Sequence, residues 1–281
     1  MKTSRTSGAS IPHATPQPEE MVAGDEDTVD RSFVTSLGRG LKVLTAFADR
    51  RRPMTMAEVS RRTNLPRASV GRSLYTLAKL GYLAEDAEHR FFLRPKVVTF
   101  AHAYLSFTPL TLAAQPVLDR LSTLVKASCS LAVLDDDHIV YLVRSASSHV
   151  MHPVFNTGRR LPACYTAIGR VILANGPREE VERYLSRLKL VRFTEHTIGS
   201  VDEMRQVLQA AREQGYASAD RQMTNTFAAV AVPVRDARGT VIAGINIISP
   251  IQKISLVKMQ ELYLDRLKAA AAELGHASTQ S

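Results

Sequence analysis

Apolar side chains recur at helical spacing between about residues 37 and 80 of the chain. A short helix is predicted after Thr55, because Thr55 and Glu58 have the spacing of a capping box. A longer helix follows at about 66–80, begun by Pro66 and ended by Gly81. Its buried stripe comprises Val70, Leu74 and Leu77, and the face of an earlier helix comprises Leu37, Leu41, Leu44 and Phe47.

Two short apolar runs, 82–84 and 90–93, come after the third helix and flank the charged turn 85–89. They predict a small β-hairpin, although the turn contains no glycine. Three helices followed by a hairpin are the order of a winged helix-turn-helix, in which the second helix of the pair enters the major groove of DNA. We therefore expect a winged helix-turn-helix over residues 31–95. A plain helical core is the alternative for the helical pattern alone.

The rest of the chain has a different pattern. A helical run begins at Pro109, and the segment 97–118 contains no charged residue. Its polar side chains and prolines make it a poor membrane span, so we interpret 96–126 as a linker helix. Beyond it, strands are predicted at 129–134, 138–143, 150–156, 227–234 and 240–248, and helices at 164–175, 178–188, 201–214 and 253–274. This order predicts an α+β fold with an antiparallel sheet over residues 127–281.

The distribution of charge indicates a partner for the first domain. The 281 residues carry a formal net charge of +9. Residues 31–100 hold fourteen basic and five acidic side chains, a net of +9, whereas residues 1–30 hold two basic and six acidic ones, a net of −4. Residues 1–30 contain few large apolar side chains, so we expect a disordered tail there. The concentrated positive charge favours double-stranded DNA as the partner of the first domain.

Candidate DNA-contacting residues lie on the polar side of the helix at 66–80 and next to it. Arg61, Arg62 and Lys79 are expected to hold phosphates, and Arg90 in the hairpin is expected to contact the backbone or the minor groove. The other polar side chains of the helix can reach base edges and phosphates. The complete set is Arg61, Arg62, Arg67, Ala68, Ser69, Arg72, Ser73, Thr76, Lys79 and Arg90.

No pattern in the chain is typical of an enzyme. The 8 histidines have no zinc-hydrolase spacing, and His149 and His152 would point to opposite faces of a strand. There is no phosphate-binding glycine loop and no nucleophile elbow. The 2 cysteines, Cys129 and Cys164, imply no disulfide framework and fit a reducing compartment. We therefore expect no enzymatic activity, no cofactor and no metal.

Three landmarks, in order along the chain, resemble the IclR family of transcriptional regulators. LPRASVGRSLYTLAKLGYL at 65–83 resembles the recognition-helix signature of that family. GRRLPACYTAIGRVILA at 158–174 resembles its effector-domain motif, and VAVPVRD at 230–236 with INIIS at 245–249 is similar to a third landmark. The resemblance implies that the second domain is GAF-like, with a pocket over its sheet that binds a small organic acid.

Two further segments narrow the resemblance to one branch of the family. FVTSLGRGL at 33–41 and SCSLAVLD at 128–135 resemble the branch that controls aromatic-acid and β-ketoadipate catabolism. This implies an aromatic acid of the hydroxybenzoate or protocatechuate type, or a ring-cleavage product, as the effector. The segment MTNTF at 223–227 departs from the glycine-rich or acidic run that many members have before the third landmark.

The residues themselves are consistent with an acid-binding site. A helix that begins just after Pro162 presents amides that favour an anion, and Thr166 adds a hydroxyl donor. Arg144, at the end of a strand, can pair with a carboxylate, while Ile168 supplies an apolar wall and the asparagines can bind a ring hydroxyl. The candidate effector-binding residues are Arg144, Met151, Phe155, Cys164, Tyr165, Thr166, Ala167, Asn225, Asn246 and Ile248.

Several of these candidates have a plainer alternative. Arg144 can be the partner of a surface ion pair, and Cys164 can be a small buried side chain that touches no ligand. Asn225 can simply form a turn. Met151 and Phe155 can belong to the hydrophobic core.

Together, the patterns predict a cytoplasmic transcription regulator whose DNA binding or activation is controlled by a small organic acid. It is expected to form a homodimer or tetramer on an operator with inverted half-sites about one helical turn (roughly 10 bp) or a multiple apart. RNA polymerase is a further expected partner if the protein is an activator, and no membrane partner is expected. The alternatives are a ligand-independent repressor or architectural DNA binder, and a protein-interaction module, which would leave the local positive charge unexplained.

Overall fold

The computed structural model describes residues 32–48, 52–146 and 156–278. These residues divide into two compact units, and the chain passes from one to the other between Tyr104 and Leu105. The tail predicted at 1–30 and all but the last residue of the strand predicted at 150–156 lie outside the described residues. Each unit has its own hydrophobic core.

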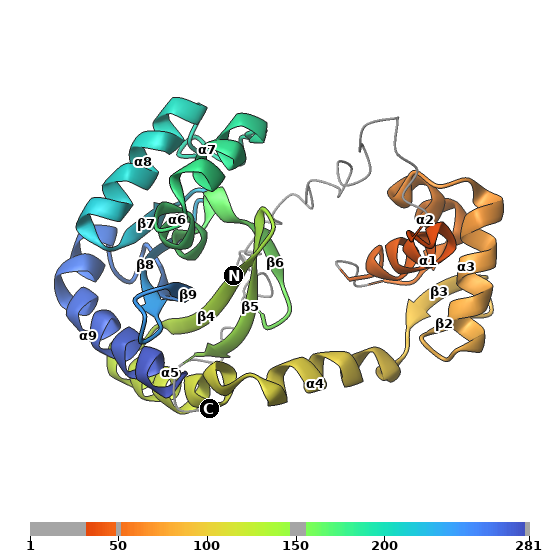
Figure 1. The fold of residues 1–281 in the computed structure, drawn as a ribbon, viewed down its shortest axis with the longest axis horizontal. Coiled ribbons are helices and arrows are strands. Elements are labelled where there is room, and N and C mark those ends of the chain that lie inside the picture. The colour runs from red at the N-terminus through yellow and green to blue at the C-terminus, as the bar shows by residue number, and fades with distance from the viewer. Residues whose placement is uncertain (1–31, 49–51, 147–155, 279–281) are drawn as a thin grey trace, which may run out of the picture. The chain divides into compact units, whose positions relative to one another are not determined.

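The unit that ends at Tyr104 is a winged helix-turn-helix (Figure 1). Its elements are α1 (Thr35–Thr45), β1 (Met54–Thr55), α2 (Met56–Thr63), α3 (Arg67–Lys79), β2 (Leu83–Glu85) and β3 (Arg90–Leu93). The strands form an antiparallel sheet in the order β1-β3-β2. The predicted helices and hairpin are confirmed. The sequence pattern does not predict β1, because a two-residue strand shows no alternation of polar and apolar positions.

The buried face of α1 differs from the predicted one. Leu37 and Leu41 are 61% and 54% exposed, whereas Val43 and Phe47 are buried. The reason is that α1 packs against α3 through its C-terminal half. Apolar residues in its N-terminal half therefore do not reach the core of this unit.

Local hydrogen bonds fix the start of α2 and the end of α3. The predicted capping box at α2 is confirmed: the Glu58 amide donates to Thr55 Oγ1 at 3.3 Å, and the Thr55 amide donates to Glu58 Oε2 at 2.8 Å. At the end of α3, the Tyr82 amide donates to the Leu77 carbonyl at 2.9 Å, and Gly81 has a φ of +80°. This geometry stops the helix, and glycine is favoured there because a left-handed φ is costly for other residues.

Replacing Thr55 by alanine is expected to lower the free energy of unfolding of this unit by about 1 kcal/mol, because the first turn of α2 loses its cap. The Thr55 amide also holds the pKa of Glu58 below its ordinary value of 4.5. A lowered carboxylate pKa stabilises the fold above the unfolded pKa, so this contribution is lost as the pH falls below about 4.5. Urea unfolding of wild type and T55A at pH 7 measures the loss of the cap. The carboxylate contribution is read from unfolding of the wild-type protein at pH 7 and pH 3, because alanine keeps the backbone amide that binds Glu58. An unchanged free energy of unfolding in T55A would contradict the capping assignment.

The wing turn needs no glycine because polar side chains organise it. Asp86 Oδ1 accepts hydrogen bonds from the amides of Glu88 at 3.0 Å and Arg90 at 2.9 Å. His89 takes the left-handed conformation, with φ 55°. Histidine is among the residues that tolerate this region, so the turn closes without glycine.

The unit that begins at Leu105 is built on a six-stranded antiparallel sheet in the order β6-β5-β4-β9-β8-β7. Its strands are β4 (Ser128–Asp135), β5 (His138–Ser145), β6 (Arg160–Pro162), β7 (Ala217–Asp220), β8 (Phe227–Arg235) and β9 (Val241–Pro250). Its helices are α5 (Pro109–Val125), α6 (Ala167–Ala174), α7 (Arg178–Arg187), α8 (Val201–Gln214) and α9 (Leu256–Ala277). The predicted α+β fold is confirmed, and the short strands β6 and β7 are additions to it.

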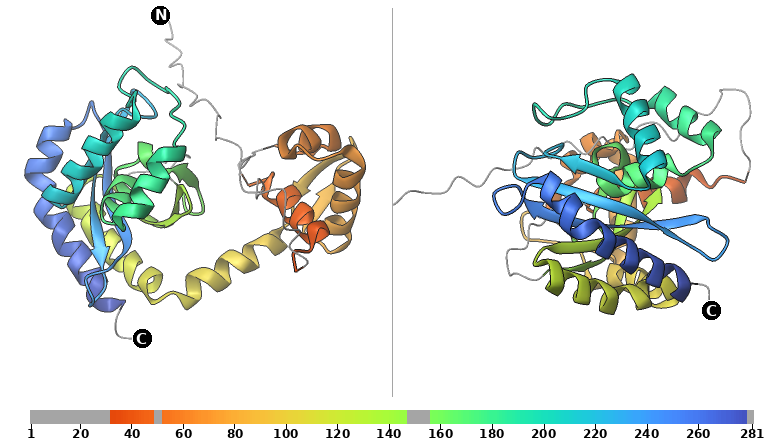
Figure 2. Two further views of the ribbon diagram at one scale, coloured as in Figure 1. Left: turned by 45° about the horizontal axis from the view of Figure 1, so that its top comes forward. Right: turned by 90° about the vertical axis from the view of Figure 1, so that its left-hand side faces the viewer.

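Helices cover both faces of this sheet (Figure 2). α5 and α9 pack on one face, around Leu118, Ile245 and Ile247. α6, α7 and α8 pack on the other, around Tyr141 and Ile168. Neighbouring residues of β9 therefore belong to different cores, as expected from the twofold alternation of a strand.

α6 lies close to the sheet because glycine occupies two contact points. A Cβ on Gly169 would collide with the backbone of Ala163, and a Cβ on Gly244 would lie 2.9 Å from Ile168 Cγ2. Both positions therefore require the absence of a side chain. Gly169 allows α6 to lie close to the preceding turn Ala163–Tyr165, and Gly244 allows it to lie close to β9.

The predicted linker helix at 96–126 consists of two differently packed parts in the structure. α4 (Val98–Phe107) follows a short 3₁₀ turn and has no buried residue within the described structure. α5, in contrast, buries an apolar face that includes Leu110, Val117 and Leu121, and so belongs to the core of the second unit. Among the described helices, none could span a membrane by itself; the segments Pro95–Phe107 and Pro109–Val125 meet the length and composition criteria only when taken together.

Candidate nucleic-acid interface and small-molecule site

One face of α3 is a polar, basic surface. Its exposed residues follow a helical stripe: Arg67, Ala68, Arg72, Tyr75, Thr76 and Lys79. The opposite face is buried through Val70, Leu74 and Leu77. α3 therefore uses its apolar side for the core and leaves a complete polar face available.

The arginines on this face of α3 form no ion pairs within the part of the unit that the structure describes. Arg67 and Arg72 form no ion pair with any residue that the structure describes. Lys79 Nζ lies 5.5 Å from the ring centroid of Tyr75, and Thr76 Oγ1 donates to the Arg72 carbonyl at 2.9 Å. Arg61, near the end of α2, is also exposed, and Arg62 is half-buried.

Two predicted contact residues are placed differently. Ser69 is only 9% exposed, because it lies beside Val70 on the side of α3 that faces the core, so its assignment to the exposed face was wrong. Ser73 is half-buried at the edge of the stripe. Arg90 binds Asp86 at 2.9 Å and Glu88 at 2.8 Å, and its hydrogen bond to Asp86 raises its pKa. Its charge is thus balanced within the wing, which argues against the predicted DNA contact.

Tyr75 is a member of the exposed stripe that the sequence analysis did not select. It is 66% exposed and lies between Arg72 and Lys79 on the helix surface. Counting three residues on from Arg72, or four back from Lys79, identifies the position.

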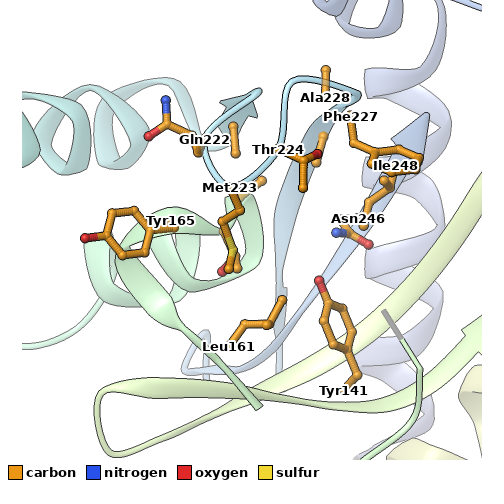
Figure 3. Close-up of a pocket in the computed structure, with 14 residues that line it drawn as sticks. Tyr141, Leu161, Tyr165, Gln222, Met223, Thr224, Phe227, Ala228, Asn246 and Ile248 are labelled. Carbon is orange, nitrogen blue, oxygen red and sulfur yellow. The ribbon is translucent and has the colours of Figure 1, made fainter. Parts of the chain in front are cut away.

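The second unit contains a pocket on the α6 side of its sheet (Figure 3). The space in it, together with the part open to solvent, is about 470 Å³. It lies between the start of α6, the sheet and the segment that joins β7 to β8. The 14 lining residues are Tyr141, Leu161, Tyr165, Thr166, Ala167, Ala219, Gln222, Met223, Thr224, Phe227, Ala228, Ala229, Asn246 and Ile248.

Five of the predicted effector-binding residues line this pocket: Tyr165, Thr166, Ala167, Asn246 and Ile248. Met151 and Phe155 lie outside the described residues. Asn225 is exposed in the turn before β8 and does not line the pocket, as expected if it only forms a turn. Cys164 is buried behind the wall, where burial raises the pKa of its thiol to about 11, so it is a neutral core side chain.

Thr166 has a different role from the predicted one. Its Oγ1 accepts from the Gly169 amide at 3.0 Å and donates to the Ala163 carbonyl at 3.2 Å, so it caps α6. The amides of Ala167 and Ile168 donate no hydrogen bond to the part of the chain that the structure describes. These amides, and not the Thr166 hydroxyl, are the donors that the start of α6 leaves for a ligand.

A row of polar side chains runs across three neighbouring strands of the sheet, β5, β4 and β9. Ser130 on β4 is in register with Arg144 on β5 and with Asn246 on β9. Arg144 does not line the pocket; it donates to Asn156 Oδ1 at 3.1 Å and to Ser128 Oγ at 3.2 Å, and burial lowers its pKa. Asn246 Oδ1 and Ser130 Oγ are buried and accept no hydrogen bond from the described residues. A buried acceptor without a donor is costly, so Asn246 marks a place for a donor from a ligand.

Tyr141 lies beside Asn246 in the pocket and was missed by the sequence analysis (Figure 3). It is fully buried, and burial raises the pKa of its phenol, whose oxygen accepts from the Asn246 side-chain NH₂ and so leaves Asn246 Oδ1 without a donor among the described residues. A tyrosine at an inward-facing position of an otherwise apolar strand is the signal that could have indicated it.

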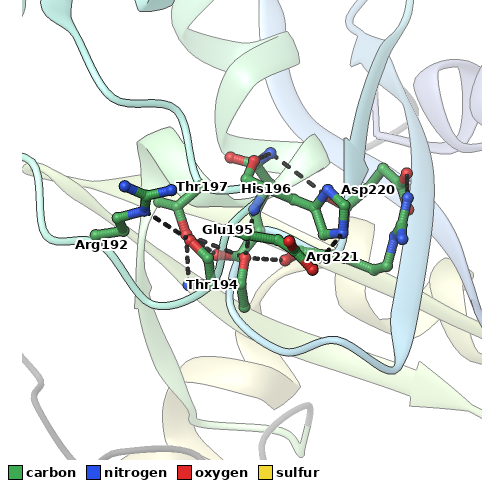
Figure 4. A network of polar contacts seen from close by, with 8 residues as sticks. Arg192, Thr194, Glu195, His196, Thr197, Asp220 and Arg221 are labelled. Carbon is green, nitrogen blue, oxygen red and sulfur yellow. Dashed lines mark hydrogen bonds and ion pairs between the residues drawn. The ribbon is translucent and has the colours of Figure 1, made fainter.

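The pocket wall at Gln222 is tied to a second loop by a polar network (Figure 4). Thr194 Oγ1 donates to the Arg221 carbonyl at 2.7 Å, and Thr197 Oγ1 donates to the Gln222 carbonyl at 2.7 Å. Gln222 Nε2 donates to the His196 carbonyl at 2.6 Å. The wall is thus held in place by side chains that do not themselves enter the pocket.

A winged helix-turn-helix with an available basic face, joined to a sheet unit with a polar-lined pocket, defines a DNA-binding transcription regulator with its own small-molecule site. Family models agree: residues 36–87 match the IclR helix-turn-helix domain, and residues 102–276 match the C-terminal region of the bacterial transcriptional regulator IclR. The chain belongs to the IclR family. The predicted family and regulatory function are therefore confirmed.

Individual relatives support this assignment over most of the chain. The chain is 39% identical to the Pca regulon regulatory protein of Pseudomonas putida, over 89% of this chain and 86% of that protein. It is 31% identical to the p-hydroxybenzoate hydroxylase transcriptional activator of Acinetobacter baylyi, over 89% of this chain and 93% of that protein. Among solved structures, a transcriptional regulator from Rhodococcus sp. RHA1 is 37% identical, with a TM-score of 0.73. The match covers 87% of this chain and 98% of that chain. These relatives are regulators of transcription, and the first two place the chain beside the aromatic-acid branch.

Proposed function

We propose that the chain regulates transcription in response to an aromatic hydroxy acid of the hydroxybenzoate or protocatechuate type, bound in the pocket beside α6. The observation that carries this proposal is the polarity of the pocket. One end has Ala167, the first residue of α6, whose amide donates no hydrogen bond to the described residues, and the other has the buried acceptor of Asn246. Leu161, Phe227 and other apolar side chains lie between them.

This polarity matches the two ends of a para-hydroxylated benzoate. A helix N-terminus favours the carboxylate, whose negative charge meets the positive end of the helix dipole. A ring hydroxyl can donate to Asn246 Oδ1 and so remove the cost of a buried acceptor. The names of two relatives, a Pca regulon regulator and an activator of p-hydroxybenzoate hydroxylase, support the same class of ligand.

The DNA-bound form is proposed to be a homo-oligomer on inverted half-sites. Exposed apolar side chains on both α1 and α4 support a second copy of the chain as partner: Leu37, Leu41, Val98, Phe100, Tyr104 and Phe107. Two α3 helices related by a twofold axis would read half-sites about one helical turn (roughly 10 bp) or a multiple apart. Contact with RNA polymerase belongs to the proposal if the regulator activates transcription.

The test is binding of the purified protein to its own upstream DNA at fixed salt, with and without benzoate, 4-hydroxybenzoate and protocatechuate. A change in affinity or footprint with a hydroxylated acid, and a weaker one with benzoate, is expected. Tight DNA binding that ignores all three acids would reject the proposed effector and leave a ligand-independent repressor or architectural binder.

Replacing Asn246 by leucine, which has a similar size, is expected to weaken 4-hydroxybenzoate binding by about 1 kcal/mol and to leave benzoate binding unchanged. The reason is that only the hydroxylated acid loses a hydrogen bond. Titration calorimetry with both acids measures the difference. Asn225→Leu is the matched control, because Asn225 lies on the exposed turn outside the pocket, and it should change neither affinity. An equal loss for both acids in Asn246→Leu would remove Asn246 from the hydroxyl end.

A further inference from the structure

Arg170 is a buried cation in the second turn of α6. Its side chain is only 3% exposed, which is rare for an arginine unless an acidic side chain pairs with it. Other arginines of the same unit, such as Arg187 and Arg205, pair with carboxylates near the surface. Arg170 therefore needs a separate explanation.

The partners of Arg170 are all neutral oxygens. Nε donates to the Cys164 carbonyl at 2.7 Å, Nη1 to the Ser218 carbonyl at 2.8 Å, and Nη2 to Gln222 Oε1 at 2.8 Å. No Asp or Glu among the described residues lies within ion-pair distance of it. Burial lowers the pKa of Arg170 to about 10, so the guanidinium is still charged at neutral pH. Its hydrogen bonds are satisfied, and the carboxylate that acts on its charge, Glu203 on the exposed side of α8, forms no ion pair with it. The buried positive charge is therefore not neutralised by direct contact.

This charge lies directly behind one end of the pocket. Gln222, which accepts from Arg170, lines the pocket, and Ser218 and Cys164 are the chain neighbours of the lining residues Ala219 and Tyr165. Figure 3 shows Gln222 and Tyr165 on the side opposite to Asn246 and Tyr141. The buried charge is thus at the same end as the first amides of α6.

We propose that Arg170 determines the specificity of the pocket for an anion: its unneutralised positive charge, acting through the wall at Gln222, selects a carboxylate ligand over a neutral ligand of the same shape. This inference rests on the proposed function, since it concerns the same pocket. Arg170 does not touch the ligand in this scheme; it sets the electrostatic potential at the carboxylate end.

The expected effect is large enough to measure. At an effective dielectric constant of about 20, a unit charge roughly 12 Å from an anion changes its binding constant by about tenfold. Salt screens a buried charge only weakly, so the effect should persist at 0.15 M ionic strength. A neutral isostere of the anion should be almost indifferent to the same charge.

The experiment compares two probes, 4-hydroxybenzoate and 4-hydroxybenzamide, which differ in charge and little in shape. Their affinities are measured by titration calorimetry for the full-length protein, for Arg170→Gln, which loses the charge, and for Arg170→Lys, which keeps it. The acid-to-amide affinity ratio should fall about tenfold in Arg170→Gln and stay within about twofold of the wild-type value in Arg170→Lys. Arg178→Gln, which removes one positive charge from the exposed start of α7, should leave the ratio unchanged.

A merely structural role for Arg170 would weaken both probes together and leave the ratio intact, which would overturn the inference. Arg170→Met provides a second charge-removing variant if Arg170→Gln does not fold, and the ratio is then read from it. Equal affinity of the wild-type protein for acid and amide would overturn the inference while leaving an aromatic ligand in place. Failure of the wild-type protein to bind either probe would reject the proposed function itself.

Discussion

Arg72→Ala is expected to weaken binding to the specific operator by about 1–3 kcal/mol and to relax specificity at one base pair. Arg72 lies at the centre of the exposed stripe of α3, and its guanidinium has no carboxylate partner in the described structure. An arginine in this position can bind the O6 and N7 atoms of a guanine through two parallel hydrogen bonds. Electrophoretic mobility shift with a set of single-base operator variants measures both affinity and specificity.

The matched control for this experiment is Arg39→Ala, which removes one exposed positive charge from α1 of the same unit. It should lower the affinity for specific and non-specific DNA by similar factors, if it changes either. A base-reading role is distinguished from phosphate binding by the operator variants, because loss of a phosphate contact weakens all sequences about equally and reduces the salt slope by about 1. Unchanged specificity in Arg72→Ala would remove Arg72 from base readout.

Leu74→Ala is expected to lower the free energy of unfolding of the winged helix-turn-helix by about 2–5 kcal/mol. Leu74 is almost fully buried between α3 and the rest of the small core, and its truncation leaves a cavity that this unit has few side chains to fill. A loss of this size is a large part of the stability of a domain of this length. DNA binding should fall with it, while binding of 4-hydroxybenzoate by the other unit should be retained.

Leu80→Ala is the control, because Leu80 is at the end of the same helix but 53% exposed. Its effect on unfolding should be within about 0.5 kcal/mol of zero. Chemical denaturation followed by a probe placed in each unit separates the two transitions. If Leu74→Ala abolished ligand binding together with DNA binding, the two units could not be treated as separate folding units.

The order of helices and hairpin in the first unit follows from local rules that act within a few residues. The Thr55–Glu58 capping box and the Gly81 stop depend only on neighbouring backbone groups, so the sequence predicts them correctly. The burial of α1 depends instead on which part of it contacts α3, and this tertiary choice exposes Leu37 and Leu41. Periodicity identifies the apolar face of a helix, but it does not show which part of that face another element packs against.

The difference between local and tertiary interactions also explains which pocket residues can be predicted from the sequence. The landmark at 158–174 contains Tyr165 and Ala167, which line the pocket, because the start of α6 is a local feature. Gln222 and Tyr141 come from segments far away in sequence, which only the sheet order brings together. Arg144 and Arg90 lie on strands, as predicted from the sequence. Their side chains, however, form hydrogen bonds or ion pairs with nearby residues, which the sequence pattern does not show.

The alternation of β9 between two cores has a mechanical consequence. Asn246 faces the pocket, whereas its neighbours Ile245 and Ile247 pack on the face covered by α5 and α9. Because a strand moves as a connected backbone, a shift of Asn246 would also shift both isoleucines against α9, which packs on α5. α5 continues from α4, the segment in which the chain leaves the DNA-reading unit. The sheet thus separates the pocket from the helices α5 and α9, and the backbone of β9 connects the two sides.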